Sequence, residues 1–298
     1  MPRVIAEFST SAMNFLYLES FSGPQSSTMS RPTRSKSAFF CSILFLSLGT
    51  SALLSGCADE TIANPAAISV TGNWQIASTA AAAIKLSALS GAFTGTSASL
   101  TGILHSNSAS ACIAPTTAFG VTGSTNTTGV TTVTGANVAG GVLTLSGTLA
   151  ANGKSLSNAT YNVVGGSCAF SAAVTGATAQ DYTPITGNYT GSFSDSSGQV
   201  LTVAAALTQS PTSDANGNFT LNGTGTFPSN PCFNSPVTVS NTQVTGGSFT
   251  FTYADPTTQN SVTSNGTFST DGTTLTVTNW TLAGPCGPDS GTGLLTKQ

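Results

Sequence analysis

The feature that most constrains the fold of this chain is an internal duplication. Gly72-Asn73-Trp74 returns as Gly187-Asn188-Tyr189, an offset of 115 residues (187 minus 72). Later landmarks recur in the same order, since Asn152-Gly153 comes before a tyrosine as Asp271-Gly272 comes before a tryptophan. Self-similarity at a fixed period indicates one structural unit that is used repeatedly. We therefore expect two copies of one domain, over residues 69–180 and 181–298.

The cysteines divide evenly between these copies. Four lie in the repeated region, at Cys112, Cys168, Cys232 and Cys286. In an oxidising compartment an even number implies disulfides, and four cysteines allow three pairings. The repeat selects Cys112 with Cys168 and Cys232 with Cys286. A zinc site is the competing interpretation, but cysteines this far apart form no closely spaced ligand pair.

The local pattern predicts β-strands throughout. In Ser248–Tyr253, aromatic residues alternate with hydroxyl residues, as on a sheet with one buried and one solvated face. Glycines after Asn or Asp, as in Asn216-Gly217, supply tight hairpin turns. The second copy contains eight such runs, at 187–195, 200–210, 217–228, 237–246, 248–255, 261–269, 274–284 and 290–297. In the first copy, Ala80–Leu89 fits a helical turn or a strand, and its alignment with the second run favours the strand.

The predicted fold class is therefore all-β, with two tandem repeats of a roughly eight-stranded antiparallel meander. Closure into an up-and-down barrel removes the exposed edges of an open sheet. Two β-sandwiches of immunoglobulin size would also accommodate the cysteines, although they usually need longer connections.

The Gly-x-Trp at the start of the first copy resembles the opening of lipocalins and their calycin relatives. Gly72-Asn73-Trp74 matches it, and Gly187-Asn188-Tyr189 matches it with tyrosine in place of tryptophan. The resemblance implies barrels that can enclose one small apolar ligand. The candidate ligand-lining residues are aromatic and are placed on inward faces: Trp74, Tyr161, Tyr189, Phe193, Phe219, Phe249, Phe251, Tyr253 and Trp280. The alternative interpretation of the same residues is an ordinary packed core.

The N-terminal region reads as an export signal. Arg31, Arg34 and Lys36 precede an apolar stretch that ends in Leu54-Ser55-Gly56-Cys57. A basic end, an apolar run and small residues before the cleavage site make up a signal peptide. The last four residues resemble the bacterial lipobox, which implies that Cys57 is lipidated and anchors the chain to a membrane. Ala58 in the next position resembles the pattern of lipoproteins sent to the outer membrane of diderm bacteria.

This interpretation divides the front of the chain into three segments. Residues 1–28 precede a second methionine, Met29, and we interpret them as an upstream start-codon artefact or a disordered segment. Residues 29–56 are the expected signal peptide, and 57–68 are the expected tether.

The charge of the chain excludes some partners. From Cys57 onward there are eight acidic residues and three basic ones, a net charge of −5. Without a basic patch, binding of nucleic acid through its phosphates is physically implausible.

Residues with catalytic potential are few. His105 is the one histidine of the chain, and we expect it on the surface or in a loop, because an unpaired histidine is seldom enough for catalysis. Most aspartates lie in turn-like contexts, which explain them without catalysis. Asp214-Ala215-Asn216-Gly217-Asn218 alternates oxygen ligands like a calcium loop, but no distal glutamate follows, so a hairpin turn is favoured. We expect no enzyme activity, no cofactor and no bound metal.

Two functions remain. The first is a membrane-anchored structural or adhesive surface module. The second is a carrier of a small apolar ligand in a lipocalin-like barrel. Partner identity and oligomeric state do not follow from the sequence.

Overall fold

The computed structural model of the chain describes residues 67–78, 86–107, 112–115, 117–169, 172–228, 230–234 and 236–298. Glu60–Gln298 form one compact unit. The segments expected at residues 1–28 and 29–56, together with Cys57 and most of the tether, lie outside the described residues.

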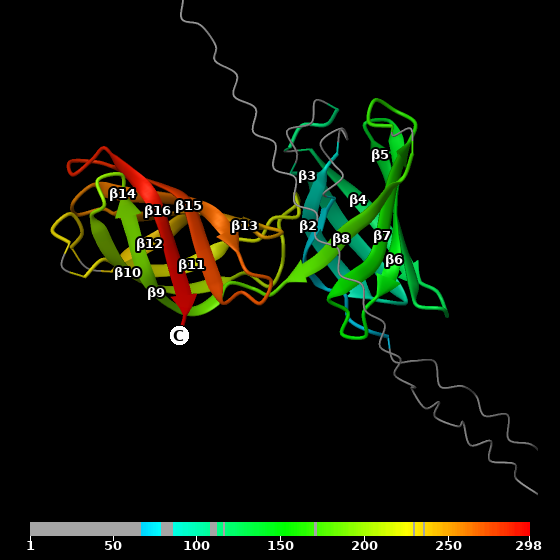
Figure 1. The fold of residues 1–298 in the computed structure, drawn as a ribbon, viewed down its shortest axis with the longest axis horizontal. Helices are drawn as coiled ribbons and strands as arrows, with labels where there is room; N and C mark the ends of the chain where they lie inside the picture. Colours follow the sequence, from blue (N-terminus) through cyan, green and yellow to red (C-terminus); the bar gives the residue numbers. More distant parts are fainter. Residues whose placement is uncertain are drawn as a thin grey trace, which may run out of the picture. The chain divides into compact units, whose positions relative to one another are not determined.

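The first copy forms a closed antiparallel barrel of eight strands in sequential order (Figure 1). The strands are β1 (Gly72–Ala77), β2 (Ala88–Thr96), β3 (Ser99–Ser106), β4 (Ala118–Thr125), β5 (Val130–Val138), β6 (Gly141–Leu149), β7 (Ser155–Val164) and β8 (Val174–Tyr182). Pairing of β1 with β8 closes the barrel, which we call barrel 1.

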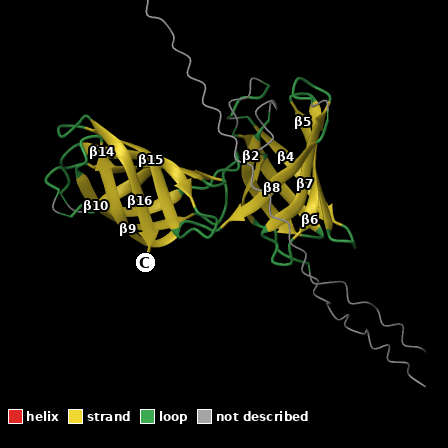
Figure 2. Cartoon of the chain, viewed as in Figure 1, coloured by secondary structure: helices red, strands yellow, loops and turns green. Residues whose placement is uncertain are grey.

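The second copy repeats this architecture as barrel 2. Its strands are β9 (Thr186–Asp195), β10 (Val200–Gln209), β11 (Leu221–Thr226), β12 (Val237–Thr245), β13 (Ser248–Asp255), β14 (Asn260–Phe268), β15 (Thr274–Ala283) and β16 (Asp289–Lys297). Pairing of β16 with β9 closes it. All strands of the described residues are joined by loops or turns, without helices (Figure 2). The prediction of two tandem eight-stranded barrels is thus confirmed, and the sandwich alternative is wrong.

The alternation of the sequence decides which side chains enter each barrel. In β6, Leu143 and Leu145 are fully buried, whereas Thr144 between them is exposed. Because successive side chains of a strand point to opposite faces, the apolar residues fill the interior and the hydroxyl residues face outward. The glycines of the three Asn-Gly or Asp-Gly turns have positive φ angles, as tight hairpins require, with 72° at Gly153, 82° at Gly217 and 69° at Gly272.

The outward hydroxyls lie in register across neighbouring strands of barrel 1. Thr101 on β3 pairs with Thr122 on β4, Thr122 with Thr134 on β5, and Thr134 with Thr144 on β6. All four side chains are exposed. Cross-strand threonine pairs stabilise a sheet, and threonine favours strands through its branched side chain. The outer wall of these strands therefore carries a row of uncharged hydroxyl groups.

The structure differs from the sequence-based segmentation at two places. Strand β8 extends to Tyr182, two residues beyond the predicted boundary at residue 180, so Asp181 lies on the last strand of barrel 1. The predicted run 217–228 shortens to Leu221–Thr226 because residues 214–218 form a hydrogen-bonded turn. Ala88 and Leu89 begin β2, which agrees with the favoured strand, while residues 79–85 lie outside the described residues.

Candidate functional site

The predicted aromatic residues of the second copy all lie inside barrel 2. Each is at most 5 % exposed: Tyr189, Phe193, Phe219, Phe249, Phe251, Tyr253 and Trp280. Their rings contact one another, since Phe249 stacks on Phe251 with centroids 5.2 Å apart and Phe193 stacks on Trp280 at 5.9 Å. Phe251 meets Tyr253 edge to face at 5.0 Å. These separations are those of aromatic pairs in a packed core.

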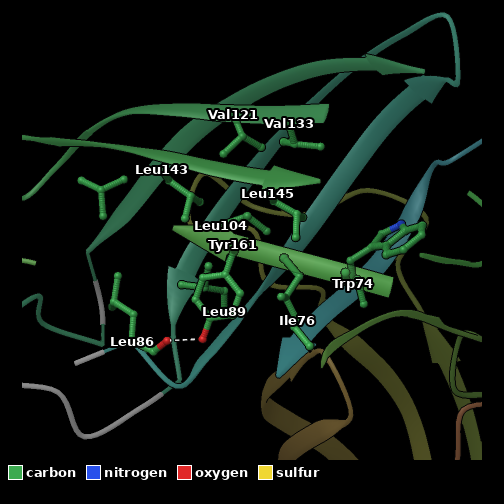
Figure 3. Packing of buried hydrophobic residues seen from close by; sticks show 14 of the residues in the cluster. Trp74, Ile76, Leu86, Leu89, Leu104, Val121, Val133, Leu143, Leu145 and Tyr161 are labelled. Carbon is green, nitrogen blue, oxygen red and sulfur yellow. Dashed lines mark hydrogen bonds between the residues drawn. The ribbon is translucent and has the colours of Figure 1, made fainter. Parts of the chain in front are cut away.

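The interior of barrel 1 is packed in the same way (Figure 3). Trp74 and Tyr161 are each 1 % exposed, among leucines that include Leu89 and Leu143. The Trp74 indole N–H donates to the carbonyl oxygen of Val70 at 2.9 Å, and the Tyr161 hydroxyl donates to the carbonyl oxygen of Leu86. Each ring therefore satisfies its one polar group on the backbone and fills the barrel with its apolar surface.

The pKa values of the buried tyrosines reflect this environment. Burial raises the pKa of Tyr161 to about 12, and it does the same for Tyr189, where the charge of Asp271 adds to the effect. These phenols stay protonated at neutral pH, so they act as hydrogen-bond donors and not as bases.

A disulfide closes one end of each barrel. Cys112–Cys168 joins the loop after β3 to the loop after β7, and Cys232–Cys286 joins the corresponding loops of barrel 2. The Cα–Cα distances are 5.2 and 5.9 Å, within the usual range of disulfides. The structure thus contains the two pairings that the repeat predicts.

The loop carrying Cys232 also inserts apolar side chains into the end of barrel 2. Phe227 and Phe233 stack with centroids 4.4 Å apart, and Phe227 meets Tyr253 edge to face. The buried Asn260 donates to the carbonyl oxygen of Cys232 at 2.8 Å. A cavity of about 110 Å³ remains beside Phe233 and Trp280.

Barrel 1 contains a buried ion pair that sequence reasoning missed. Asp181 is 4 % exposed and pairs with the half-exposed Lys154. Burial raises the pKa of Asp181 above its usual range, and the hydrogen bond and charge of Lys154 oppose this shift. An added Cβ at Gly72 would lie 2.1 Å from Asp181 Oδ1, so the glycine of the Gly-x-Trp motif leaves room for this carboxylate. Sequence reasoning assigned Asp181 to the start of the second copy and so did not place it on the last strand of barrel 1.

The prediction that His105 lies on the surface or in a loop is wrong, because this residue is on β3 and is 5 % exposed. Its Nδ1 lies 3.0 Å from the carbonyl oxygen of Asn216, and its Nε2 lies 3.1 Å from Oγ1 of Thr245. Because a carbonyl oxygen only accepts, Nδ1 carries the proton, and Nε2 accepts from the threonine hydroxyl. Burial lowers the pKa of His105, which favours this neutral form. The outer wall of barrel 1 is covered by barrel 2 at this point.

The covering segments are two turns of barrel 2. In the turn before β11, the Asp214 carboxylate accepts hydrogen bonds from the backbone N–H groups of Asn216 and Asn218 at 2.8 and 2.9 Å. In the turn between β12 and β13, Gly246 exchanges two hydrogen bonds with the Asn73 side chain, at 2.7 and 2.8 Å. Residues 214–218 are thus a capped turn, as favoured over a calcium loop.

A polar groove opens where these turns meet barrel 1. It has a volume of about 610 Å³. Barrel 1 contributes His105, Ser106, Asn107 and Pro115, and barrel 2 contributes Asp214, Asn216, Asn218, Phe219, Thr220, Thr242, Gln243, Thr245 and Ser248. Phe219 belongs to the buried cluster of barrel 2, as predicted, and also borders this groove.

Comparisons of the chain with models of protein families, with curated proteins and with solved structures find no match. The candidate sites therefore rest on geometry. The described residues contain no group of three or more His, Cys, Asp or Glu side chains that could hold a metal ion. In the same part of the chain, no helix has the length and hydropathy needed to cross a membrane.

Proposed function

We propose that this protein is a membrane-anchored extracytoplasmic lipoprotein that acts as a structural or adhesive surface module without catalytic chemistry. The observation that carries the proposal is the filling of both barrels by their own side chains. Trp74 and Tyr161 in barrel 1, and the stacked aromatic residues of barrel 2, are at most 5 % exposed. A barrel whose interior is packed contributes rigidity and an outer surface rather than an internal binding site.

The outer surface supports a role in contact with other molecules. Exposed threonines lie in register across the outer faces of β3–β6. Among the described residues of barrel 1, the charged side chains are those of Lys154 and Asp181, which pair with each other. Uncharged polar walls of this kind favour short-range hydrogen bonding over long-range electrostatic attraction.

The two disulfides support an extracytoplasmic location, since such bonds persist in oxidising compartments. Anchoring at Cys57 is the part of the proposal that follows from the signal sequence. It places the barrels beyond a tether of residues 57–68.

The carrier alternative receives less support. Ligand pockets for drug-sized molecules typically occupy about 300–1,000 Å³. The cavity beside Trp280 measures about 110 Å³, and Phe227 and Phe233 close that end of barrel 2. A small apolar ligand would have to displace these side chains.

Lipid anchoring is tested by metabolic labelling of expressing bacteria with an alkyne fatty acid. We expect the full chain to be labelled, Cys57→Ser to lose the label, and Cys41→Ser to keep it, because Cys41 lies within the expected signal peptide. Label that survives Cys57→Ser would contradict the anchor.

Filled interiors are tested by native mass spectrometry of the lipoprotein purified from its own host. We expect the mass of the lipidated chain with no co-purifying small molecule. A stoichiometric apolar adduct that Trp280→Ala abolishes would favour the carrier.

A further inference from the structure

The groove between His105 and the turn at Asp214 has the chemistry of a binding site. Its lining is rich in side-chain amides, from Asn107, Asn216, Asn218 and Gln243, and in hydroxyls. Amides both donate and accept, and hydroxyls do the same. Such a lining matches a ligand whose own groups both donate and accept hydrogen bonds.

Several of these groups are free to bind. In the hydrogen bonds of the described residues, the side chains of Asn216, Thr220 and Ser248 have no protein partner, although all three line the groove. Asn216 and Thr220 are exposed, whereas Ser248 is partly buried. A ligand can therefore bond to them without first breaking bonds within the protein.

The turn at residues 214–218, which forms one wall of the groove, is fixed by hydrogen bonds. His105 fixes the backbone of the turn through Asn216, and Asp214 caps the same turn from within. Gly217 has a φ of +82°, and a Cβ added there would lie 2.6 Å from the carbonyl oxygen of Ile103 on barrel 1. A turn fixed on both sides loses little conformational freedom when a ligand binds, which lowers the cost of binding.

The charges around the groove select against anionic ligands. None of its described lining residues is Lys or Arg, so a phosphate or carboxylate ligand would lack a cationic partner. Burial lowers the pKa of His105, which favours its neutral form. The acidic side chain of the lining is Asp214, and its carboxylate accepts hydrogen bonds from two backbone N–H groups.

The polarity of the lining also selects against an apolar ligand, which would bury amides and hydroxyls without partners. The volume of about 610 Å³ lies within the usual range of small-molecule sites, about 300–1,000 Å³. The exposed Pro115 adds apolar surface that can pack against the C–H face of a sugar ring.

We infer that this groove binds a neutral, hydroxyl-rich ligand, namely a segment of an uncharged oligosaccharide. The site lies outside both barrels and is formed by the two copies together. The inference deepens the adhesive part of the proposed function, on which it rests, by naming the class of molecule that would be bound. It does not depend on the lipid at Cys57.

The test uses the purified lipoprotein in detergent micelles on an array of malto-, cello-, xylo- and chito-oligosaccharides, with acidic oligosaccharides as a separate arm. A neutral oligosaccharide that binds is then titrated by calorimetry. We expect Asn216→Ala and Thr220→Val each to weaken binding by about three- to tenfold, the effect of one lost neutral hydrogen bond.

Two matched variants serve as controls. Asn188→Ala removes an exposed amide on β9, and Thr122→Val removes an exposed hydroxyl on β4, and neither residue lines the groove. We expect both to bind as the unmodified protein does. Near-ultraviolet circular dichroism checks that all four variants are folded, and Thr220→Val carries the test if Asn216→Ala does not fold.

The inference is overturned if no neutral oligosaccharide binds, if only acidic ones bind, or if the control variants weaken binding as much as the groove variants. These failures are distinguishable from failure of the proposed function, because lipid labelling at Cys57 and the native mass are measured without a saccharide.

Discussion

Gly72→Ala should destabilise the protein, and Asp181→Ala should remove most of this effect. An ideal Cβ at Gly72 would lie 2.1 Å from Oδ1 and 2.6 Å from Cγ of Asp181, well below the ordinary contact range. The backbone φ of Gly72 is not in the left-handed region, so the conflict is steric alone. Because Asp181 is buried, its carboxylate has to leave its place beside Lys154 to make room.

The magnitude follows from these two effects. Overpacking of a filled site costs about 1–3 kcal/mol. Disturbing the buried end of the ion pair adds to this cost, although Lys154 is half exposed and can be solvated. We expect Gly72→Ala to lower the free energy of unfolding by about 3 kcal/mol. The Asp181→Ala variant lacks the carboxylate that the new Cβ would meet, so adding Gly72→Ala to it should lower the free energy of unfolding by less than about 1 kcal/mol. The coupling energy between positions 72 and 181 is then about 2 kcal/mol.

The assay is urea denaturation followed by tryptophan fluorescence. The chain has two tryptophans, and Trp280→Phe leaves Trp74, beside the mutated glycine, as the reporter of barrel 1. Gly120→Ala on β4 is the matched control, because its added Cβ would meet nothing within 4 Å. Additive effects of the two substitutions, or an equal loss in Gly120→Ala, would refute the steric explanation.

Three further predictions use contrasts within the chain. Asn73→Ala should cost about 2 kcal/mol because it leaves buried backbone groups unpaired, whereas Asn188→Ala, its exposed counterpart, should be neutral in the same denaturation assay. Tyr253→Phe should leave the free energy of unfolding unchanged or raise it by up to about 1 kcal/mol, since the Tyr253 hydroxyl is buried without a partner; Tyr189→Phe should lower it by about 1 kcal/mol, and equal effects would contradict this difference. Hydrogen bonds from the Ser269 hydroxyl and from the backbone N–H and hydroxyl of Thr273 lower the pKa of Asp271 to about 2, whereas it is about 3.9 in an unfolded chain. The ionised Asp271 therefore stabilises the folded protein above about pH 4, and this stabilisation is lost as the pH falls towards 2. The difference in melting temperature between the unmodified protein and Asp271→Asn should therefore narrow from about pH 6 to about pH 2, and a constant difference would contradict the assignment.

Much of the architecture was predictable because it depends on short-range patterns. Alternation of apolar and hydroxyl residues assigned the strands, and turns such as Asp271-Gly272 separated them. The repeat then selected Cys112 with Cys168 among the possible pairings. The aromatic residues predicted for the interior, such as Tyr189 and Phe251, are buried as expected.

The functional candidates were less predictable, and His105 shows why. It sits at an outward position of β3, where alternation predicts exposure, and it lacks a counterpart in the second copy. Barrel 2 covers it through Asn216 and Thr245, which lie 111 and 140 residues away in the sequence. No local signal could have identified these partners. The groove, formed by both copies, was unpredictable for the same reason.

Asn73 and Asn188 occupy equivalent positions in the two copies, and they show what the sequence determines and what the tertiary structure determines. The sequence by itself determined that Asn73 and Asn188 follow a glycine at the start of a barrel strand and point outward, because strand periodicity and the repeat are local properties. Only the tertiary structure decided that Asn73 is buried against Gly246 while Asn188 faces solvent. Outward faces of a closed barrel have no fixed environment, so their burial depends on which other part of the chain packs against them.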